Sequence, residues 1–434
     1  MSCLLLQEKF PDFKAETTKG ELSIHEYFGT SWGILLSHPG DFTPVCTTEL
    51  ARMVKLFSEF EKRNVKLIAI SLDSKDNSLK WIKDINTFGG YDPNAPLPYP
   101  IIADEDRSIA VKLGMVRPGA VSTPGLPLTA RHVFVVDPKK ILRLILIYPA
   151  STGRYFPEIL RAIDSLQLTE KYGVSTEADW KGQLKYHKRY TISQKTVVHS
   201  AHPTPSAYLT PSTYPYPHYT GNKMIQCNLT KSVRLEELLT NWGVLFSHPR
   251  DYTPVCTTEL GRAVKLAPEF KKRNVRMIAL SIDSVADHLG WSKDINSYNC
   301  DEPTETLPFP IIADPKRDLA IMLGMLDPDE KDNEGMPVTA RCVYIIGPDK
   351  KMKLSILYPA TTGRNFDEIL RVVDSLQLTA THNVATPVDW KPGDRVMVPP
   401  NIPQEEASKI FTCGVFTKEL PSGKSYLRYT AQPK

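Results

Sequence analysis

The feature that most constrains this 434-residue sequence is an internal repeat. The octamer Thr43–Leu50 reads Thr-Pro-Val-Cys-Thr-Thr-Glu-Leu and recurs unchanged as Thr253–Leu260, an offset of 210 residues (253 minus 43). The same offset relates Trp180 to Trp390, so the register needs no net gap over most of each copy. Such a long period indicates two copies of a whole domain rather than a solenoid of small repeats.

The composition changes abruptly between the two copies. From Thr196 to Asn222 there is no Lys, Arg, Asp or Glu, and prolines alternate with Tyr, Ser, Thr and His. This composition is typical of a semi-extended linker that cannot bury a core. We therefore predict a first domain at 1–182, a Pro/Tyr-rich linker at 183–222, and a second domain with a C-terminal arm at 223–434.

The two copies differ at their ends. Copy one has an N-terminal stretch, Phe10–Leu22, that copy two barely retains in sequence. Copy two continues past Trp390, whereas copy one passes into the linker after Trp180. We expect each copy to lack an arm that the other supplies.

Composition and charge exclude several classes of protein. Hydrophobic residues make up 41% of the chain and charged residues 24%, values typical of a soluble globular protein. The net charge of +4 is small for this length and gives no support for a nucleic-acid partner. No apolar run approaches the roughly 20 residues of a membrane span, and the start has no signal peptide, which predicts a cytoplasmic location. The seven cysteines are odd in number and form no CxxC pair, so we expect neither a disulfide framework nor a metal site.

The hydrophobic pattern predicts an α/β fold. Gly33–Ser37 and Val65–Ser71 are short apolar runs typical of buried strands, and the region 133–147 resembles a hairpin. An amphipathic helix is expected between the first two strands, with a helical stripe of apolar residues: Leu50, Met53, Val54, Phe57 and Phe60. A strand, helix and strand in this order favour a layered α/β domain with a right-handed crossover.

Cys46 falls in the loop that leads into this helix. Pro44 is compatible with a helix that begins there. The amide groups of a helix start and nearby cations stabilise a thiolate, which is the form that attacks peroxides. Thr43 offers a hydroxyl to hold a peroxide oxygen, and a basic residue from elsewhere is required. Taken alone, Cys46 would be a buried structural cysteine, but the duplicated motif reverses that interpretation.

The motif around this cysteine resembles that of the peroxiredoxin family. Pro39–Cys46 reads Pro-Gly-Asp-Phe-Thr-Pro-Val-Cys, and Pro249–Cys256 reads Pro-Arg-Asp-Tyr-Thr-Pro-Val-Cys. Both are similar to the family pattern Pro-x-x-x-(Thr/Ser)-x-x-Cys. The one-cysteine, peroxiredoxin-6-like branch is matched best, because a histidine precedes each proline. The resemblance covers both copies nearly end to end and implies two tandem thioredoxin-like domains.

The resemblance also implies the roles of individual residues. Each copy would carry a peroxidatic cysteine, a threonine that binds peroxide, and an arginine in Pro-x-Thr-Ala-Arg that holds the thiolate and the substrate. By position these catalytic residues are Cys46, Thr43 and Arg131 in copy one, and Cys256, Thr253 and Arg341 in copy two.

For a second set of residues, the sequence leaves open whether they support the catalytic site or have only a structural role. Glu49 and Glu259 orient the arginine or favour the helix N-terminus. Arg154 and Arg364 support the site or simply pair with an acid. The histidines contact substrate or reductant, or pack at the strand end. The whole set is Pro39, His38, Glu49 and Arg154, with Pro249, His248, Glu259 and Arg364.

The implied activity is a thiol-dependent peroxidase that reduces hydrogen peroxide and organic hydroperoxides, phospholipid hydroperoxides among them, through a cysteine sulfenic acid. Copy one has only Cys3 besides Cys46, so a one-cysteine cycle fits better than a two-cysteine cycle. No bound cofactor is expected. Glutathione, delivered by a glutathione transferase, is the expected external reductant. The family also implies an internal pseudo-dimer or a homo-oligomer, and contact with a membrane surface only through lipid peroxides.

Two alternatives come from other functional classes. The peroxiredoxin-6-like branch is associated with a calcium-independent phospholipase A2 activity that uses a Ser, a His and an Asp. Ser31 and His25 match this set in copy one, but the aspartate position is matched only by Asp349 of copy two. Ser31 also precedes a strand, unlike the serine of a nucleophile elbow. The other alternative is a redox-sensing or chaperone-like binding protein, in which an oxidised cysteine alters partner contacts.

Overall fold

The computed structural model describes residues 4–116, 128–182, 186–188, 224–227, 233–234 and 241–433. The linker expected at 183–222 lies outside these residues apart from strand β9 (Tyr186–Lys188), and so does Cys3. The chain forms two compact units. Unit 1 combines Met1–Gln7 with Arg161–Phe366, and unit 2 combines Glu8–Leu160 with Asp367–Lys434. The domain boundaries drawn from the repeat stay a prediction, as does the oligomeric state.

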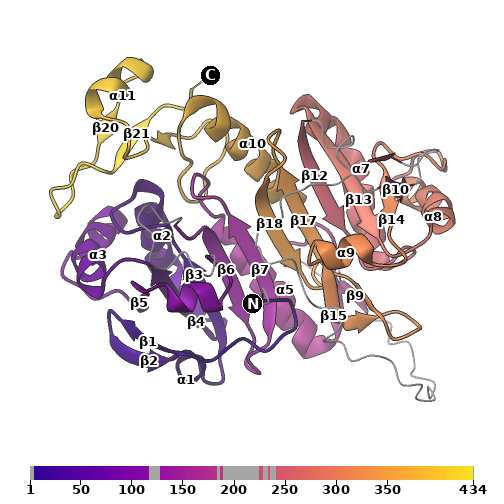
Figure 1. The fold of residues 1–434 in the computed structure, drawn as a ribbon, viewed down its shortest axis with the longest axis horizontal. Helices are drawn as coiled ribbons and strands as arrows, with labels where there is room; N and C mark the ends of the chain where they lie inside the picture. Colours follow the sequence, from indigo (N-terminus) through magenta and orange to yellow (C-terminus); the bar gives the residue numbers. More distant parts are fainter. Residues whose placement is uncertain are drawn as a thin grey trace. The chain divides into compact units, whose positions relative to one another are not determined.

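Unit 2 contains a mixed seven-stranded arrangement in the order β7-β6-β3-β4-β5-β1-β2 (Figure 1). Its central pairs β3–β4 and β4–β5 are parallel, and the flanking pairs β3–β6 and β6–β7 are antiparallel. The strands are β1 (Lys14–Thr17), β2 (Gly20–Ser23), β3 (Trp32–Ser37), β4 (Val65–Ser71), β5 (Ile101–Ala103), β6 (Arg131–Val136) and β7 (Leu142–Tyr148). Every residue of β3 is buried, as the continuous apolar run predicted.

Unit 1 repeats this order as β18-β17-β12-β13-β14-β10-β11. The strands that correspond are β10 (Met224–Cys227), β11 (Val233–Arg234), β12 (Trp242–Ser247), β13 (Val275–Ser281), β14 (Ile311–Ala313), β17 (Arg341–Ile346) and β18 (Met352–Tyr358). Unit 1 also contains β8 (Val174–Thr176), which pairs with β9, and β15 (Leu326–Lys331), which pairs with β16 (Pro337–Thr339). The expected α/β thioredoxin-like fold, present twice, is confirmed.

The expectation that copy two barely retains the N-terminal stretch is wrong. Strand β10 begins 210 residues after β1 and pairs with β14 in the antiparallel way in which β1 pairs with β5. Strand β11 likewise pairs with β10 as β2 pairs with β1. The sequences of these strands differ between the copies because an edge pair is held mainly by backbone hydrogen bonds, which any residue but proline can donate.

The helices follow local signals in the sequence. Helix α2 (Pro44–Glu61) begins with proline at its first position after the extended residue Thr43. Helix α3 (Lys75–Gly89) is capped by Ser74, whose side chain accepts a hydrogen bond from Asn77 N. In unit 2 the other helices are α1 (Ile24–Phe28), α4 (Ser108–Lys112), α10 (Phe366–His382, from Asp367 on) and α11 (Gln404–Ile410). In unit 1 they are α7 (Pro254–Lys272), α8 (Val285–Tyr298) and α9 (Asp318–Met322); α5 (Phe156–Tyr172) begins in unit 2 and continues in unit 1.

Each unit is completed by the C-terminal part of the other copy. In unit 2, Arg52 Nε donates to Asp389 Oδ2 at 2.7 Å, and Asp389 Oδ1 accepts from Phe156 N at 2.8 Å. In unit 1, Arg262 Nε donates to Asp179 Oδ2 at 2.6 Å, and Asp179 Oδ1 accepts from Phe366 N at 2.7 Å. The expected arm of copy two therefore joins unit 2, but the segment that copy one supplies to unit 1 is the part around Asp179 and not the expected N-terminal stretch.

Two glycines make this exchange sterically feasible. A Cβ atom on Gly153 would lie 2.3 Å from the carbonyl oxygen of Pro387 in unit 2. A Cβ atom on Gly363 would lie 2.2 Å from the carbonyl oxygen of Glu177 in unit 1. Real Cβ atoms do not approach a carbonyl oxygen that closely. The glycine of each Thr-Gly-Arg sequence is therefore required, because the backbone of the exchanged segment passes next to it.

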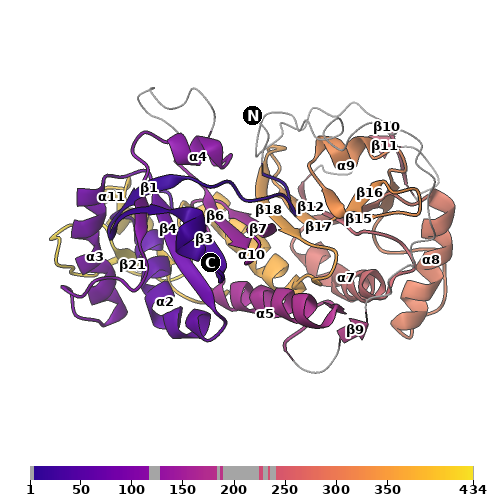
Figure 2. The same cartoon turned by 90° about the horizontal axis from the view of Figure 1, so that it is seen from below.

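The C-terminal arm of copy two adds a small subdomain to unit 2. It contains α11, β19 (Val396–Met397), β20 (Phe416–Thr417) and β21 (Arg428–Thr430), drawn in yellow in Figures 1 and 2. Its own apolar cluster consists of Val384, Trp390, Val396, Val398, Ile402, Ala407 and Phe411. Among the described residues, no helix is long and apolar enough to cross a membrane.

Candidate active site

Cys46 lies in the first turn of α2, two positions after Pro44. Thr43 precedes the helix with extended backbone angles (φ −113°, ψ 149°), so the chain turns sharply into the helix at this point. The cysteine side chain has no exposed surface. Its sulfur therefore stands at the positive end of a helix, in a site from which bulk water is excluded.

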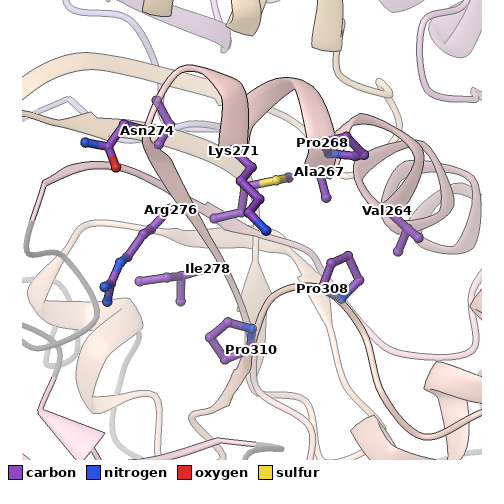
Figure 3. Close-up of a pocket in the computed structure, with 11 residues that line it drawn as sticks. Val264, Ala267, Pro268, Lys271, Asn274, Arg276, Ile278, Pro308 and Pro310 are labelled. Atoms are coloured by element: carbon purple, nitrogen blue, oxygen red, sulfur yellow. The ribbon is translucent and has the colours of Figure 1, made fainter.

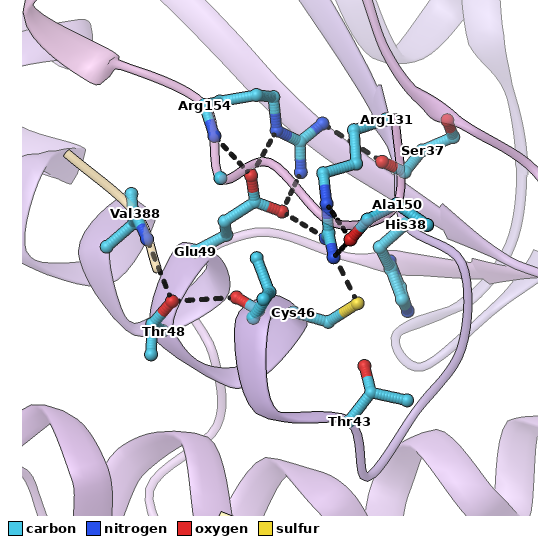
Figure 4. A network of polar contacts seen from close by, with 12 residues as sticks. Ser37, His38, Thr43, Cys46, Thr48, Glu49, Arg131, Ala150, Arg154 and Val388 are labelled. Carbon is cyan, nitrogen blue, oxygen red and sulfur yellow. Dashed lines mark hydrogen bonds and ion pairs between the residues drawn. The ribbon is translucent and has the colours of Figure 1, made fainter. Parts of the chain in front are cut away.

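An arginine on β6, the strand next to β3, supplies the basic residue that the sequence requires beside the cysteine. Arg131, the first residue of β6, donates from Nη1 to Cys46 Sγ at 3.2 Å and to Glu49 Oε2 at 2.7 Å (Figure 4). Its Nε and Nη2 atoms donate to the carbonyl oxygen of Ala150 at 3.1 and 2.6 Å. The guanidinium is therefore held at both ends, with one edge presented to the sulfur.

Glu49 connects this arginine to a second one. Arg154 donates to Glu49 from its backbone N (2.8 Å), from Nε (3.0 Å) and from Nη2 (2.8 Å). Its Nη1 donates to the carbonyl oxygens of Ser37 and His132. Arg154 has no exposed surface and does not contact the sulfur, so it acts as a positioning residue. These contacts favour the interpretation that Glu49 and Arg154 support the site, which stays a prediction.

The electrostatics of the network follow from its burial. Burial by itself would raise the pKa of Glu49, but the charges of Arg131 and then Arg154 outweigh it and hold that pKa below its ordinary value. Burial would lower the pKa of Arg131, but the charges of Glu49 and Cys46 raise it. The carboxylate of Glu49 and the guanidinium of Arg131 thus each favour the ionised form of the other.

Copy two reproduces this arrangement in unit 1. Arg341 Nη1 donates to Cys256 Sγ at 3.3 Å and to Glu259 Oε2 at 2.6 Å. Arg364 donates to Glu259 from its backbone N at 2.8 Å and from Nη2 at 2.7 Å. The contacts of the arginines with the cysteine and the glutamate are therefore the same in the two copies.

Thr43 faces the sulfur from the opposite side. In Figure 4 its hydroxyl group points toward Cys46, and it donates to the carbonyl oxygen of Gly40 at 2.8 Å. Thr253 makes the same contact with Arg250 O at 3.0 Å in copy two. Each hydroxyl oxygen keeps a free lone pair toward the site. A peroxide oxygen held there would lie between the threonine and the arginine, as the motif predicts.

The histidines at the strand ends pair with an aspartate of the same motif. His38 Nε2 lies 2.8 Å from Asp41 Oδ1, and the His38 ring packs 5.1 Å from the Trp81 ring. His248 Nε2 and Asp251 Oδ1 are equally 2.8 Å apart. The prolines that follow, Pro39 and Pro249, are buried. Asp41 and Asp251 were not predicted as site residues, although their recurrence at the 210-residue offset could have identified them.

Copy two extends this pair into a chain of three side chains. His288 Nδ1 lies 2.6 Å from Asp251 Oδ2, where copy one has Ser78, which donates to Asp41 Oδ2. Burial would raise the pKa of Asp251, but the hydrogen bonds from His248 and His288 lower it to about 2. Burial also lowers the pKa of His248.

The same region contains a group of residues of the metal-ligating type. His248, Asp251 and Asp283 each place one ligand atom within 4.8 Å of the others. The ring nitrogen of His248 and a carboxylate oxygen of Asp251 already bond to each other, and Asp283 Oδ2 accepts from Asp251 N at 2.9 Å. We therefore interpret the group as a hydrogen-bonded structure, and the absence of a metal in this protein stays a prediction.

His132 gives copy one a titratable group that copy two lacks. It is 1% exposed, and its Nδ1 lies 3.2 Å from both Ser37 Oγ and Ala130 O. Burial lowers the pKa of His132 to about 4. The matching residue of copy two is Cys342, whose thiol pKa is raised by burial to about 12.

This difference predicts an acid sensitivity of unit 2. Between pH 6.5, the ordinary pKa of histidine, and pH 4, the unfolded chain binds a proton at His132 that the folded chain does not. The contribution of neutral His132 to stability is therefore complete above about pH 6.5 and is lost as the pH falls toward 4, by about 3 kcal/mol in total. Hydrogen exchange of unit 2 peptides as a function of pH measures the loss.

The control is His132→Cys, which installs the residue of copy two. Burial raises the pKa of Asp104 to about 6, and this carboxyl makes unit 2 less stable as the pH rises through that range. Wild type and variant share the Asp104 effect, so their difference isolates the histidine. A variant with the same pH dependence as the wild type would contradict the prediction.

The residues of the hydrolase alternative do not form a catalytic set. Ser31 Oγ donates to Asn64 Oδ1 at 2.8 Å, and His25 Nε2 lies 2.7 Å from Phe10 O. Neither contact is the serine–histidine hydrogen bond that an activated nucleophile needs. Asp349 belongs to unit 1 and pairs with Lys353 at 2.6 Å.

A pocket of about 720 Å³ lies in unit 1 between α7 and β13 and contains none of the site residues (Figure 3). It is lined by Lys271 and Arg276 among apolar side chains. The strand of copy one that corresponds to β13 is β4. Tyr27 lies against it, because the Tyr27 hydroxyl donates to Leu67 O at 2.8 Å. The position that matches Tyr27 is Glu237, which lies outside the described residues.

The remaining described cysteines form no disulfide bond. Cys227 and Cys342 are buried, and Cys300 and Cys413 are exposed. Cys342 Sγ contacts the carbonyl oxygen of Met325 at 3.9 Å. We interpret these cysteines as structural or incidental.

Comparisons with known proteins agree with the geometry. The AhpC/TSA family matches residues 6–145 and 216–355, and the C-terminal domain of 1-Cys peroxiredoxin matches 375–412. Peroxiredoxin-6 of Homo sapiens is 77% identical over 202 residues, which are 46% of this chain and 90% of that protein. Peroxiredoxin-6 of Bos taurus is 80% identical over 193 residues, which are 44% and 86%. A crystal structure of a mutant peroxiredoxin 6 of Arenicola marina covers 49% of this chain and 96% of its own, with 58% identity and a TM-score of 0.47.

Proposed function

Because this chain belongs to the AhpC/TSA family and is a peroxidase of the one-cysteine peroxiredoxin type, we propose that both of its copies are active, each with its own cysteine. The observation that carries this proposal is the contact of Arg131 with Cys46 and Glu49, which Arg341 repeats with Cys256 and Glu259. A disabled copy under no constraint would not keep a buried arginine aimed at its cysteine.

The first step is an attack of the thiolate on the terminal oxygen of a hydroperoxide. A sulfur–oxygen bond forms and the O–O bond breaks, so the cysteine is oxidised by two electrons and the peroxide is reduced. The departing oxygen leaves with the bonding pair and takes a proton from water, which yields water from hydrogen peroxide or an alcohol from an organic hydroperoxide. Arg131 and Thr43 are placed to stabilise the charge that develops on this oxygen.

The second half of the cycle restores the thiol. One glutathione attacks the sulfenic acid, so that water leaves and a mixed disulfide forms. A second glutathione attacks this disulfide, which releases oxidised glutathione and the cysteine thiolate. Glutathione as the reductant, a glutathione transferase as its carrier, organic and phospholipid hydroperoxides as substrates, and a cytoplasmic location are parts of this proposal. Among the residues that the structure describes, no contact favours the hydrolase or the redox-sensing alternative over the peroxidase.

The test is hydrogen peroxide consumption with glutathione and a glutathione transferase, for wild type, Cys46→Ser, Cys256→Ser and the double variant. We expect each single variant to keep part of the activity and the double variant to keep none. If one single substitution abolishes turnover, only that copy is a peroxidase. Full activity in the double variant would refute the proposal.

A further inference from the structure

The loop that leads into the cysteine helix contains a buried aspartate in each copy. In copy one this is Asp41, whose side chain has no exposed surface. Its carboxylate accepts hydrogen bonds from Ser71 Oγ at 2.9 Å and from Ser78 Oγ at 2.6 Å. The third partner is His38, whose Nε2 lies 2.8 Å from Asp41 Oδ1. Three side chains therefore converge on one carboxylate two residues before the peroxide-binding threonine.

The contact between His38 and Asp41 fixes the position of the hydrogen on the imidazole ring. A carboxylate only accepts hydrogen bonds, so His38 Nε2 must carry the hydrogen that lies between the two groups. His38 Nδ1 is buried, and it has no hydrogen-bond partner among the described residues. A hydrogen on Nδ1 would be a buried donor without an acceptor, which is costly. Both sides of the ring therefore favour the tautomer with a hydrogen on Nε2 and a lone pair on Nδ1.

A hydroperoxide bound at the sulfur brings an O–H group that needs an acceptor, because it leaves its water partners outside a buried site. Arg131 can only donate, and the Thr43 hydroxyl gives its own hydrogen to Gly40 O. Figure 4 shows the ring of His38 extending toward the side of the site where the Cys46 sulfur and the Thr43 hydroxyl lie. An unprotonated Nδ1 gives this side of the site a hydrogen-bond acceptor.

Copy two holds its aspartate through the same histidine contact but with a different second donor. His248 Nε2 lies 2.8 Å from Asp251 Oδ1, and His248 Nδ1 is buried without a partner in the described part of the chain. His288 stands where copy one has a serine, and its Nδ1 lies 2.6 Å from Asp251 Oδ2. Its Nε2 is likewise buried without a described partner. Each histidine thus donates to the carboxylate from one nitrogen and keeps a lone pair on the other.

We infer that Asp41 and Asp251 are positioning residues of the two peroxidase sites, because each holds its histidine in the tautomer whose Nδ1 accepts a hydrogen bond. This inference rests on the proposed peroxidase function of both cysteines. The aspartates act through the histidines at the strand ends, and the quantity that they control is the position of one hydrogen on each ring.

The first measurement is the tautomer itself, by NMR of the full chain with ¹⁵N-labelled histidine. Nitrogen chemical shifts distinguish a ring nitrogen that carries a hydrogen from one that does not. His38→Gln and His248→Gln identify the signals of the two rings, because each removes one set. We expect both rings in the neutral form with the hydrogen on Nε2 at neutral pH. A hydrogen on Nδ1 of either ring would overturn the inference.

Two substitutions of Asp41 then separate the tautomer from the packing of the loop. Asp41→Asn keeps the volume and an oxygen that accepts from His38, and its amide can donate to Ser78 Oγ. It should keep the tautomer, and the rate constant with hydrogen peroxide should change little. Asp41→Ala removes the acceptor, so the ring loses its preference and the rate constant should fall by about 10–100-fold. Both are measured on Cys46 by stopped-flow fluorescence, in the Cys256→Ser background.

Copy two offers a matched test because its second donor is itself a histidine. In Asp251→Asn we expect the amide oxygen at the Oδ1 position, where His248 and Ser281 Oγ (3.3 Å) both donate. The amide nitrogen then faces His288 Nδ1, which must give up its hydrogen and accept. His288 should therefore change to the tautomer with a hydrogen on Nε2, while His248 keeps its own. The rate constant of Cys256, in the Cys46→Ser background, should then change little.

The outcomes that contradict a positioning role are distinct from a failure of the peroxidase function. An unchanged rate constant in Asp41→Ala would contradict it, and so would a slower reaction in which His38 keeps its hydrogen on Nε2, because the loss would then be structural. A change of tautomer at His248 without a slower reaction of Cys256 would also contradict it. If neither cysteine reacts with hydrogen peroxide in the wild type, the peroxidase function itself fails, whereas the spectra still report the tautomers.

Discussion

Replacing Glu49 with alanine is expected to destabilise unit 2 by about 3–5 kcal/mol, the largest effect of any single change in the site. The carboxylate is fully buried and accepts hydrogen bonds from both Arg131 and Arg154, which are themselves 2% and 0% exposed. Without it, Arg154 stays buried without its carboxylate partner and Arg131 keeps only the Cys46 sulfur, so the desolvation of the two guanidinium groups is no longer compensated.

Hydrogen exchange resolved to peptides of α2 and β6 measures this effect in the full chain. A local readout is needed because a chain of two compact units does not unfold in a single two-state transition. Glu259→Ala should give the same loss in α7 and β17 of unit 1. Glu59→Ala is the control, because this glutamate pairs with Lys62 and Arg63 at the surface and its removal should change little. Unchanged protection in Glu49→Ala would show that the network does not contribute to stability.

Arg131→Met is expected to slow the reaction of Cys46 with hydrogen peroxide by about 10²–10³-fold. Methionine fills much of the same volume but offers no donor to the sulfur or to the departing oxygen. The guanidinium edge that now lies 3.2 Å from Cys46 Sγ is what the substitution removes. The rate constant is measured in the Cys256→Ser background, so that only Cys46 reacts.

Two controls separate catalysis from folding. Arg131→Lys keeps the positive charge but loses the planar fork that reaches Glu49 and Ala150 together, so it should recover only part of the rate. Arg341→Met in the same background should leave the rate of Cys46 unchanged. A wild-type rate in a folded Arg131→Met variant would remove the arginine from the mechanism.

Much of the fold could be predicted because its signals are local. The apolar run Gly33–Ser37 became the buried strand β3, and Ser74 caps α3 as a residue of its type does. The contacts of Cys46 with a basic residue could be anticipated, because the helix start and the repeated arginine are both visible in sequence. For Glu49, the sequence allows either support of the arginine or stabilisation of the helix N-terminus.

The exchanged segments could not be placed from the sequence. Asp389 meets Arg52 across 337 residues, and no local pattern indicates which copy it joins. The C-terminal arm repeats only weakly at the 210-residue offset, which relates Tyr426 to Tyr216 but Lys424 to Tyr214, so the repeat did not identify these residues. The N-terminal strands of copy two were not predicted because their side chains differ from those of copy one. Their backbone pairing is nevertheless the same.

The exchange of arms also has a consequence for biosynthesis. Unit 2 needs Asp389 and the residues around it, which leave the ribosome long after Arg52. At about 5–20 residues per second, the 337 residues between them correspond to roughly 20–70 seconds during which the first copy waits for its missing part. Through that interval the nascent first copy exposes apolar surface that the arm later covers. We therefore expect co-translational chaperones to bind this chain longer than they bind a single copy of the same domain.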